Sequence, residues 1–330
     1  MVKHPHSGVS ILGIGSAPAE AIVSNEDLTR IVDTTDEWIF SRTGIRERRK
    51  LAPAENNSDL ATRAARQAIA DAGLTPADLD LIVCATCSPD SILPSVACTV
   101  AGNLDLTATP AFDLNAACSG FVYSLSTAAQ FIQNGAMRHV LVIGSEALTR
   151  MVNYTDRSTC ILFGDGAGAV VLGPANGRRE FQDFFLAANG KSRNLITAGL
   201  GTAFIPDAKY VEEKTHTIKM AGKEVYKFAI NVVTEMLETA MHKHHITAEN
   251  LGLVIPHQAN DRILEAARER LELSKEQFFS NVVRFGNTSA ASIPIALKEA
   301  HDTGRMPEGK YVILVAFGGG LTWASSVWKW

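Results

Sequence analysis

The chain has 330 residues, 46% of them hydrophobic and 20% charged, which is ordinary for a globular protein able to bury a large core. Its 31 Lys and Arg against 35 Asp and Glu give a formal charge of −4, which argues against a nucleic-acid-binding protein. The absence of a membrane-length apolar run, of a secretory signal at the start and of an even cysteine count argues against membrane and disulfide-rich secreted classes. We therefore expect a soluble, cytoplasmic enzyme of about two structural units.

Apolar, strand-like runs at residues 81–85, 111–114 and 139–143 follow one another in the first part of the chain. A helical pattern runs between the last two, from about Ser119 to Asn134, and Gly135 supplies a stop signal. Strands that alternate with helices of this length indicate βαβ units and a mostly parallel sheet covered by helices. The predicted fold class is therefore α/β.

The same order of elements occurs twice. Residues 75–85 line up with residues 247–257, and each segment is followed by a small-residue turn and then by a closing apolar strand. The turns lie at 115–120 and 286–291, and the closing strands at 139–143 and 310–315. The sequence thus predicts two duplicated halves, residues 1–174 and 175–330, joined in an irregular Gly- and Pro-rich region from 173 to about 217.

Three residues in these repeated positions could carry chemistry. Cys118 stands between a strand and a helix, where the helix N-terminus would favour the thiolate of a nucleophile, although a buried structural cysteine is the common alternative. His257 follows the strand at 253–256, where α/β sheets place ligands, and its alternative is a core or capping histidine. Asn287 alone would be a helix N-cap. The duplication predicts that all three meet on one face of the sheet.

A Cys-His-Asn set also occurs in papain-like hydrolases, and the order and spacing of the three residues fit that class. However, Cys118 lies a third of the way along the chain and lacks the surrounding residues typical of such enzymes. Two other segments could have functional roles in addition to structural ones. The glycine run after Phe317 could present a backbone N–H to a reacting oxygen, and the basic residues 42–50 after Trp38 could hold a phosphate-rich ligand whose base stacks on the indole.

Motifs in a fixed order connect these residues. They are Asp36-Glu-Trp-Ile-Phe-Ser-Arg-Thr-Gly-Ile-Arg-Glu-Arg, Asn115-Ala-Ala-Cys-Ser-Gly-Phe, Asp156-Arg-Ser-Thr, Phe163-Gly-Asp-Gly-Ala-Gly-Ala, Pro256-His-Gln-Ala-Asn, Gly286-Asn-Thr-Ser-Ala-Ala-Ser and Phe317-Gly-Gly-Gly. Together they resemble the thiolase-superfamily condensing enzymes, specifically the β-ketoacyl-acyl carrier protein synthase III family. The resemblance implies a thiolase-like fold of duplicated βαβαβ halves in α-β-α-β-α layers. It further implies a homodimer with no metal and no cofactor, the CoA thioester being a substrate.

The resemblance also implies a reaction, the decarboxylative Claisen condensation that starts fatty-acid biosynthesis. Cys118 would take the acyl group from an acyl-CoA primer, and malonyl-acyl carrier protein would then lose carbon dioxide and attack it to give 3-oxoacyl-acyl carrier protein. His257 and Asn287 would donate hydrogen bonds to the enolate oxygen, and the backbone N–H groups of Cys118 and Gly319 would form the oxyanion hole. The alternative is a related condensing enzyme of secondary metabolism that uses acyl-CoA primers with another second substrate.

By the same resemblance, further residues receive binding roles. Leu93 and Phe317 would shape the acyl pocket, and since relatives often carry Phe where Leu93 stands, primers longer or more branched than acetyl are expected. Glu269 stands where relatives often have a basic residue, which would weaken carrier docking. The residues implied to bind CoA are Thr34, Trp38, Arg42, Arg157 and Asn260. Those implied to dock the carrier protein are Gln258, Ala259, Asn260, Asp261, Arg262, Lys227 and Arg270.

Overall fold

The computed structural model describes residues 8–199, 201–203 and 207–330. The first seven residues, where we expect no export signal, and positions 200 and 204–206 of the predicted joining region lie outside the described residues. Among the described helices, none has the length and apolar character needed to cross a bilayer.

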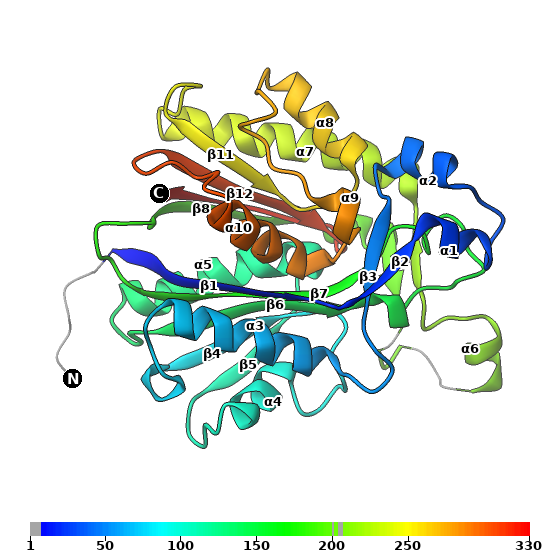
Figure 1. The fold of residues 1–330 in the computed structure, drawn as a ribbon, viewed down its shortest axis with the longest axis horizontal. Helices are drawn as coiled ribbons and strands as arrows, with labels where there is room; N and C mark the ends of the chain where they lie inside the picture. The colour runs from blue at the N-terminus through cyan, green and yellow to red at the C-terminus, as the bar shows by residue number, and fades with distance from the viewer. Residues whose placement is uncertain (1–7, 200, 204–206) are drawn as a thin grey trace.

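The first half of the chain forms five neighbouring strands in the order β5-β4-β6-β7-β1. Strands β5, β4 and β6 are parallel, with β5 at the edge of the sheet, whereas β7 runs antiparallel to both β6 and β1. Helices α3 and α4 cover the outer face of these strands (Figure 1). The elements are β1 (Val9–Pro18), α3 (Asn57–Asp71), β4 (Leu81–Ala85), α4 (Val96–Asn103), β5 (Ala111–Leu114), α5 (Gly120–Gln133), β6 (Val140–Ala147) and β7 (Asp165–Pro174).

The second half repeats this order with four strands, β11-β12-β13-β8, and helices α7 and α8 cover their outer face. A single pairing between Ser10 of β1 and Glu180 of β8 joins the halves, so the described strands form one nine-stranded sheet. The proposed division after residue 174 falls between β7 and β8. The elements are β8 (Glu180–Ala188), α7 (Gly222–Lys243), β11 (Leu251–Pro256), α8 (Asp261–Arg270), α10 (Ser292–Asp302), β12 (Tyr311–Gly318) and β13 (Thr322–Lys329).

Figure 1 shows five layers, because α5 and α10 lie between the two halves of the sheet. Leu81 and Val83 of β4 face this central layer, while Ile82 between them packs against the outer helices. In β11, Leu253 faces the central layer and Val254 the outer one. Strands buried on both faces read as continuous apolar runs, which is why the sequence located them.

The two halves share details of backbone geometry when they are aligned as the predicted repeat, with residue 75 on residue 247. A single turn of 3-10 helix, Ala117–Ser119, precedes α5, and its counterpart Ser289–Ala291 precedes α10. Ala117 and Ser289, the equivalent first residues, both have φ of 47°. Such a positive φ is costly for residues other than glycine, so the same strained turn at both places is a strong sign of duplication.

The predicted irregular joining region is partly wrong, because β8 occupies nine of its residues. Only Phe181 of this strand is buried, since most of its side chains lie at the edge of the apolar core. The strand lacks an alternating pattern, and its apolar run at residues 184–188 lies among the Gly and Pro residues that suggested an irregular segment.

A cap of short elements covers one end of the central layer, at the right of Figure 1. Its own core includes Leu28, Ile39, Ile45 and the buried apolar residues at 148, 151, 152 and 160–163. This cap brings residues from the first half over the ends of β11 and α10. Its elements are β2 (Ala21–Ser24), α1 (Asn25–Thr29), α2 (Asp36–Thr43), β3 (Glu47–Lys50), β9 (Ile196–Ala198), α6 (Ala208–Glu212), β10 (Ile218–Met220) and α9 (Val282–Phe285).

Candidate active site

Cys118 lies in the tight turn between β5 and α5. The side chain of Asn115 accepts a hydrogen bond from the N–H of Ala117 at 3.1 Å, which supports the positive φ of that residue. The end of β12 passes directly beside Cys118: a Cβ atom on Gly318 would lie 2.6 Å from the Cys118 nitrogen. Only glycine permits this close approach of two backbones. The glycine run therefore reaches the predicted nucleophile from the other half of the molecule.

Burial raises the pKa of the Cys118 thiol to about 12, and the negative charge of Glu146 acts in the same direction. The Ser289 hydroxyl acts in the opposite direction, but burial outweighs it. Burial therefore opposes the thiolate that the sequence predicts at this helix N-terminus, and the thiolate stays a prediction. The sequence could not show this, because desolvation depends on residues that arrive from both halves.

His257 follows directly after β11. The backbone N–H of His257 donates to the Val315 carbonyl at 2.8 Å, and Nδ1 of its ring lies 2.7 Å from Ser292 Oγ. The imidazole meets the Phe317 ring edge to face, with 5.4 Å between ring centroids. Burial lowers the pKa of His257 to about 3, so the ring is neutral at physiological pH.

Asn287 lies between α9 and the turn before α10. Its backbone is held to the cap by two hydrogen bonds, from its N–H to the Leu162 carbonyl at 2.8 Å and from the Gly164 N–H to its own carbonyl at 3.0 Å. The side-chain oxygen accepts from the Ser289 N–H at 2.9 Å. With Oδ1 so engaged, the NH₂ group is the part of the amide available as a donor to a ligand.

The structure brings Cys118, His257 and Asn287 together on the wall of one cavity of about 590 Å³. Trp38, Arg42, Lys227, Asn260, Arg262 and Phe317 also line it, together with apolar residues of the cap. Its polar rim is thus rich in cations, although the chain as a whole is slightly acidic. A neutral imidazole and an amide beside a cysteine give two hydrogen-bond donors and one nucleophile in one enclosed space.

At the mouth of this cavity, two arginines contact the indole of Trp38. The guanidinium carbons of Arg42 and Arg157 lie 4.8 and 4.4 Å from the ring centroid, and Arg157 also donates to the Asp33 carbonyl at 2.9 Å. Thr34 Oγ1, close by in sequence, is buried without a hydrogen-bond partner among the described residues. These are the residues that the resemblance assigns to CoA, and a base between Trp38 and Arg157 would have to part the two side chains.

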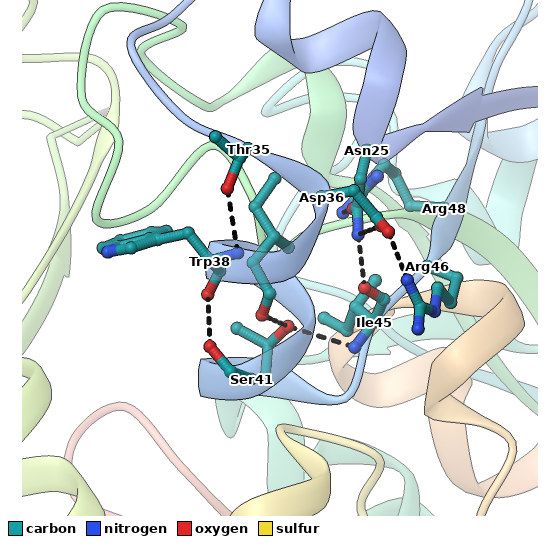
Figure 2. Close-up of polar contacts among 10 residues, drawn as sticks. Asn25, Thr35, Asp36, Trp38, Ser41, Ile45, Arg46 and Arg48 are labelled. Atoms are coloured by element: carbon teal, nitrogen blue, oxygen red, sulfur yellow. Dashed lines mark hydrogen bonds and ion pairs between the residues drawn. The ribbon is translucent and has the colours of Figure 1, made fainter.

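Figure 2 shows two arginines of the basic stretch at 42–50, Arg46 and Arg48, on the side of α2 opposite to Trp38. Arg48 is buried and donates to Asn25 Oδ1 and to the Ile161 carbonyl, both at 2.8 Å. Burial lowers the pKa of its guanidinium to about 10. Arg46 pairs with Asp36. The hypothesis of a phosphate-binding cluster is therefore wrong for these two arginines, and of the basic stretch only Arg42 lines the cavity.

The predicted docking segment divides into a buried and an accessible part. Gln258 is 1% exposed, and its amide accepts from the Asn281 N–H and donates to the Pro256 carbonyl, both at 2.8 Å. Gln258 therefore offers no surface to a carrier protein, which corrects the prediction for this residue, whereas Ala259, 8% exposed, lines the first cavity. Among the others, Asn260 caps α8 through the Arg262 N–H, Asp261 accepts from Ser280, and Arg270 donates to Asn231.

A second cavity of about 450 Å³ lies on the other side of Cys118. Its apolar wall includes Leu148, Met151, Ile196 and Ile218, and its polar wall includes Cys87, Ser289 and Gly319. Phe317, predicted for the acyl pocket, lines the first cavity instead. Leu93 lines neither and is 84% exposed, so it can shape an acyl pocket only in another copy of the chain.

Sequence reasoning missed Glu146, which lies fully buried behind the second cavity. Its carboxyl accepts hydrogen bonds from the Cys87 N–H at 3.2 Å, from the Thr86 hydroxyl at 3.3 Å and from Ser88. Burial raises its pKa, although these donors act against the shift. A signal existed, because Glu146 is the one charged residue of the otherwise apolar strand β6.

Comparison with known proteins now supplies the family. The sequence models described as 3-oxoacyl-[acyl-carrier-protein] synthase III and as its C-terminal part match residues 112–190 and 241–330. A relative from Caldanaerobacter subterraneus, named β-ketoacyl-[acyl-carrier-protein] synthase III, is 47% identical over 321 residues, which cover 97% of each chain. The chain belongs to the β-ketoacyl-[acyl-carrier-protein] synthase III family.

Solved structures agree with this family and with the layered fold. The 3-oxoacyl-[acyl-carrier-protein] synthase III of Aquifex aeolicus superimposes with a TM-score of 0.91 at 42% identity, over 98% of this chain and 100% of that one. The priming β-ketosynthase of the R1128 polyketide pathway gives 0.90 at 32% identity, over 99% and 98%. The predictions of a thiolase-like α/β fold and of a synthase III enzyme of the condensing type are therefore confirmed.

Proposed function

We propose that this chain catalyses the decarboxylative Claisen condensation of an acyl-CoA primer with malonyl-acyl carrier protein, giving a 3-oxoacyl-acyl carrier protein and initiating fatty-acid biosynthesis. The observation that carries the proposal is the position of Cys118, which lines both cavities, with His257 and Asn287 on the wall of one of them. A nucleophile at such a junction can receive a group through one cavity and hold it in the other.

In the first half-reaction, acyl-CoA enters through the larger cavity. The contacts for its nucleotide part are Trp38, Arg42 and Asn260, which line the cavity, together with Arg157 against Trp38 and the nearby Thr34. The Cys118 sulfur attacks the thioester carbonyl, the carbon–sulfur bond to CoA breaks, and the proton given up by the Cys118 thiol is balanced by the one that the CoA sulfur takes up as it leaves as a thiol. The acyl chain occupies the second cavity, whose apolar wall suits a primer longer or more branched than acetyl.

In the second half-reaction, malonyl-acyl carrier protein loses carbon dioxide at the same site. The Nε2–H of His257 and the amide of Asn287 donate hydrogen bonds to the thioester oxygen as enolate character develops on it. The carbon so generated attacks the acyl-Cys118 carbonyl, and the oxygen of that tetrahedral intermediate accepts from the N–H groups of Cys118 and Gly319. The intermediate collapses by breaking the carbon–sulfur bond to Cys118, which releases the 3-oxoacyl-acyl carrier protein, and the Cys118 thiolate takes up a proton from solvent. One donor of this kind is typically worth about a hundred- to a thousandfold in rate.

Two surfaces provide for the protein partners. Lys227 and Arg262 on the rim of the first cavity, with Arg270 on the same helix as Arg262, suit an acidic carrier and its phosphopantetheine arm. Ile92 and Leu93 are 77% and 84% exposed in a loop beside the edge strand β5. Exposed apolar side chains at a sheet edge favour contact with a second copy, so we infer a homodimer, acting in the cytoplasm.

The second candidate function is priming of another carbon-chain pathway. The similarity to the polyketide priming β-ketosynthase at 32% identity supports it. The two functions share the acyl-Cys118 step and differ in the carrier that supplies the second substrate.

The first experiment is mass spectrometry of the peptide that contains Cys118, after exposure to a panel of acyl-CoAs and then to malonyl-acyl carrier protein. We expect an acyl adduct on Cys118 that the chase transfers to the carrier with two added carbons, and no adduct in Cys118→Ala. An adduct released by water alone would indicate a hydrolase, and the absence of any adduct would remove Cys118 as nucleophile. Transfer only to a carrier of another pathway would favour the second candidate.

A further inference from the structure

The proposed mechanism needs a proton on Nε2 of His257, and the structure contains a group able to place it there. Ser292, the first residue of α10, is buried, and its Oγ lies 2.7 Å from Nδ1 of His257. The same oxygen accepts a hydrogen bond from the Gln258 N–H at 3.3 Å. Among the described residues, these two groups are the partners of the Ser292 hydroxyl.

The proton count of this small network is decisive. The Gln258 N–H can only donate, so it occupies one lone pair of Ser292 Oγ, while the hydroxyl proton of Ser292 is left to donate. Nδ1 of His257 is the acceptor within reach. A neutral imidazole carries one proton, so a ring that accepts at Nδ1 carries its proton at Nε2. The reverse tautomer would leave the buried hydroxyl proton without an acceptor, which is costly.

The duplication gives independent support, because the first half shows how the equivalent positions pack when no histidine is present. In the alignment of the two halves, His257 corresponds to Ala85 and Ser292 to Gly120. There the backbones pack closely: a Cβ on Gly120 would lie 3.2 Å from the Cβ of Ala85. The fold therefore requires no side-chain hydrogen bond at this place. The hydroxyl is present in the half that has the imidazole.

We infer that Ser292 is a positioning residue that fixes His257 as the Nε2–H tautomer, so that the ring donates to the thioester oxygen of the malonyl substrate. The inference rests on the proposed function for its kinetic consequence, but the tautomer itself is a property of the protein alone. Without the hydroxyl, Nδ1 and Nε2 would share the proton according to solvent and substrate, and part of the enzyme would present an acceptor to the thioester oxygen.

The test compares Ser292→Ala with Ser292→Thr, which keeps the hydroxyl, and with Ser126→Ala. Ser126 is a matched control, since it is buried in α5 of the same central layer and donates only to the Val122 carbonyl of its own helix. Nitrogen-15 NMR of histidine-labelled protein, with the His257 signals assigned by difference from His257→Ala, reports the tautomer. Rates of malonyl decarboxylation and of Cys118 acylation are measured on the same samples.

We expect wild type, Ser292→Thr and Ser126→Ala to show the Nε2–H tautomer, and Ser292→Ala to show a mixture. The decarboxylation rate should fall about ten- to a hundredfold in Ser292→Ala, while the rate of Cys118 acylation changes less than about twofold. Ser292→Thr should retain most of the wild-type decarboxylation rate. An Nδ1–H signal in wild type, or unchanged decarboxylation in a folded Ser292→Ala, would overturn the inference. If Ser292→Ala does not fold, the wild-type and Ser292→Thr spectra decide. Failure of wild type to acylate would instead remove the proposed function and leave the tautomer result standing.

Discussion

The two halves of the molecule have the same backbone at the site and opposite chemical duties. In the alignment of the halves, Cys118 corresponds to Ala290, whereas Ala85 corresponds to His257. The first half therefore supplies the nucleophile and the second half the hydrogen-bond donors. Because the two 3-10 turns lead into helices of one central layer, residues far apart in sequence meet without a long functional loop.

Asn115 and Asn287 show what the duplication kept and what it added. Each accepts through Oδ1 from the N–H of the residue two positions on, at 3.1 and 2.9 Å, and that residue has φ of 47° in both halves. Supporting the strained turn is therefore a shared structural duty. Asn287 has a second duty, because it also lines the cavity that contains Cys118 and His257. A residue with two duties needs a variant that separates them.

The largest expected effect comes from removing the donor that has no counterpart in the first half. In His257→Ala, malonyl decarboxylation should fall about a hundred- to a thousandfold, because the developing enolate loses one of its two side-chain donors. Acylation of Cys118 should change far less. The two half-reactions are measured separately, by carbon dioxide release and by mass spectrometry of the acyl adduct. Normal decarboxylation together with lost acylation would reverse the assigned roles.

A smaller effect separates the two duties of Asn287. Asn287→Asp keeps an oxygen to accept from the Ser289 N–H but replaces the donating NH₂ group by an acceptor, so decarboxylation should fall about ten- to a hundredfold with little loss of thermal stability. Asn115→Asp, the matched change in the first half, keeps the same turn and should reduce decarboxylation less than about threefold. Equal losses in the two variants would mean that Asn287 acts only through the turn.

The sequence predicted what depends on local pattern. Apolar runs and a repeat of constant offset predict both small-residue turns, the strands around them and the meeting of Cys118 with His257. Both patterns can be recognised in a single sequence. Roles carried by exact motifs, such as those of Trp38 and Arg157, came from the family resemblance rather than from the residues alone.

The predictions that failed depend on burial, which cannot be determined from the sequence of a single residue's surroundings. Gln258 and Arg48 look like surface residues because their types usually are, yet both are buried and hydrogen-bonded to backbone carbonyls. The rise in the pKa of the Cys118 thiol was missed for the same reason, since its desolvation comes from elements of both halves. Strand β8 was missed because it has no alternating pattern, Phe181 being its one buried residue, and because Gly and Pro residues surround it.

The smallest expected effect concerns Glu146, whose counterpart in the second half is Gly318. Burial raises the pKa of Glu146 above its ordinary value of 4.5, so the folded chain keeps this proton to higher pH than the unfolded chain does. The contribution of Glu146 to the free energy of unfolding is therefore most favourable below pH 4.5 and is lost as the pH rises through the folded pKa.

Glu146→Gln is neutral at every pH. Over a series from about pH 4 to about pH 8, its stability relative to wild type should improve from pH 4.5 up to the folded pKa of Glu146 and stay level above it, whatever the fixed cost of replacing the carboxyl. Urea unfolding of both proteins across this range measures the difference. Glu238→Gln, which removes an exposed carboxyl from α7, controls for the change in net charge. A difference between wild type and Glu146→Gln that stays constant with pH would mean that the donors around Glu146 offset its burial completely. In that case the buried carboxyl of Glu146, which has no counterpart in the second half, would add no net electrostatic cost to the folding of the first half.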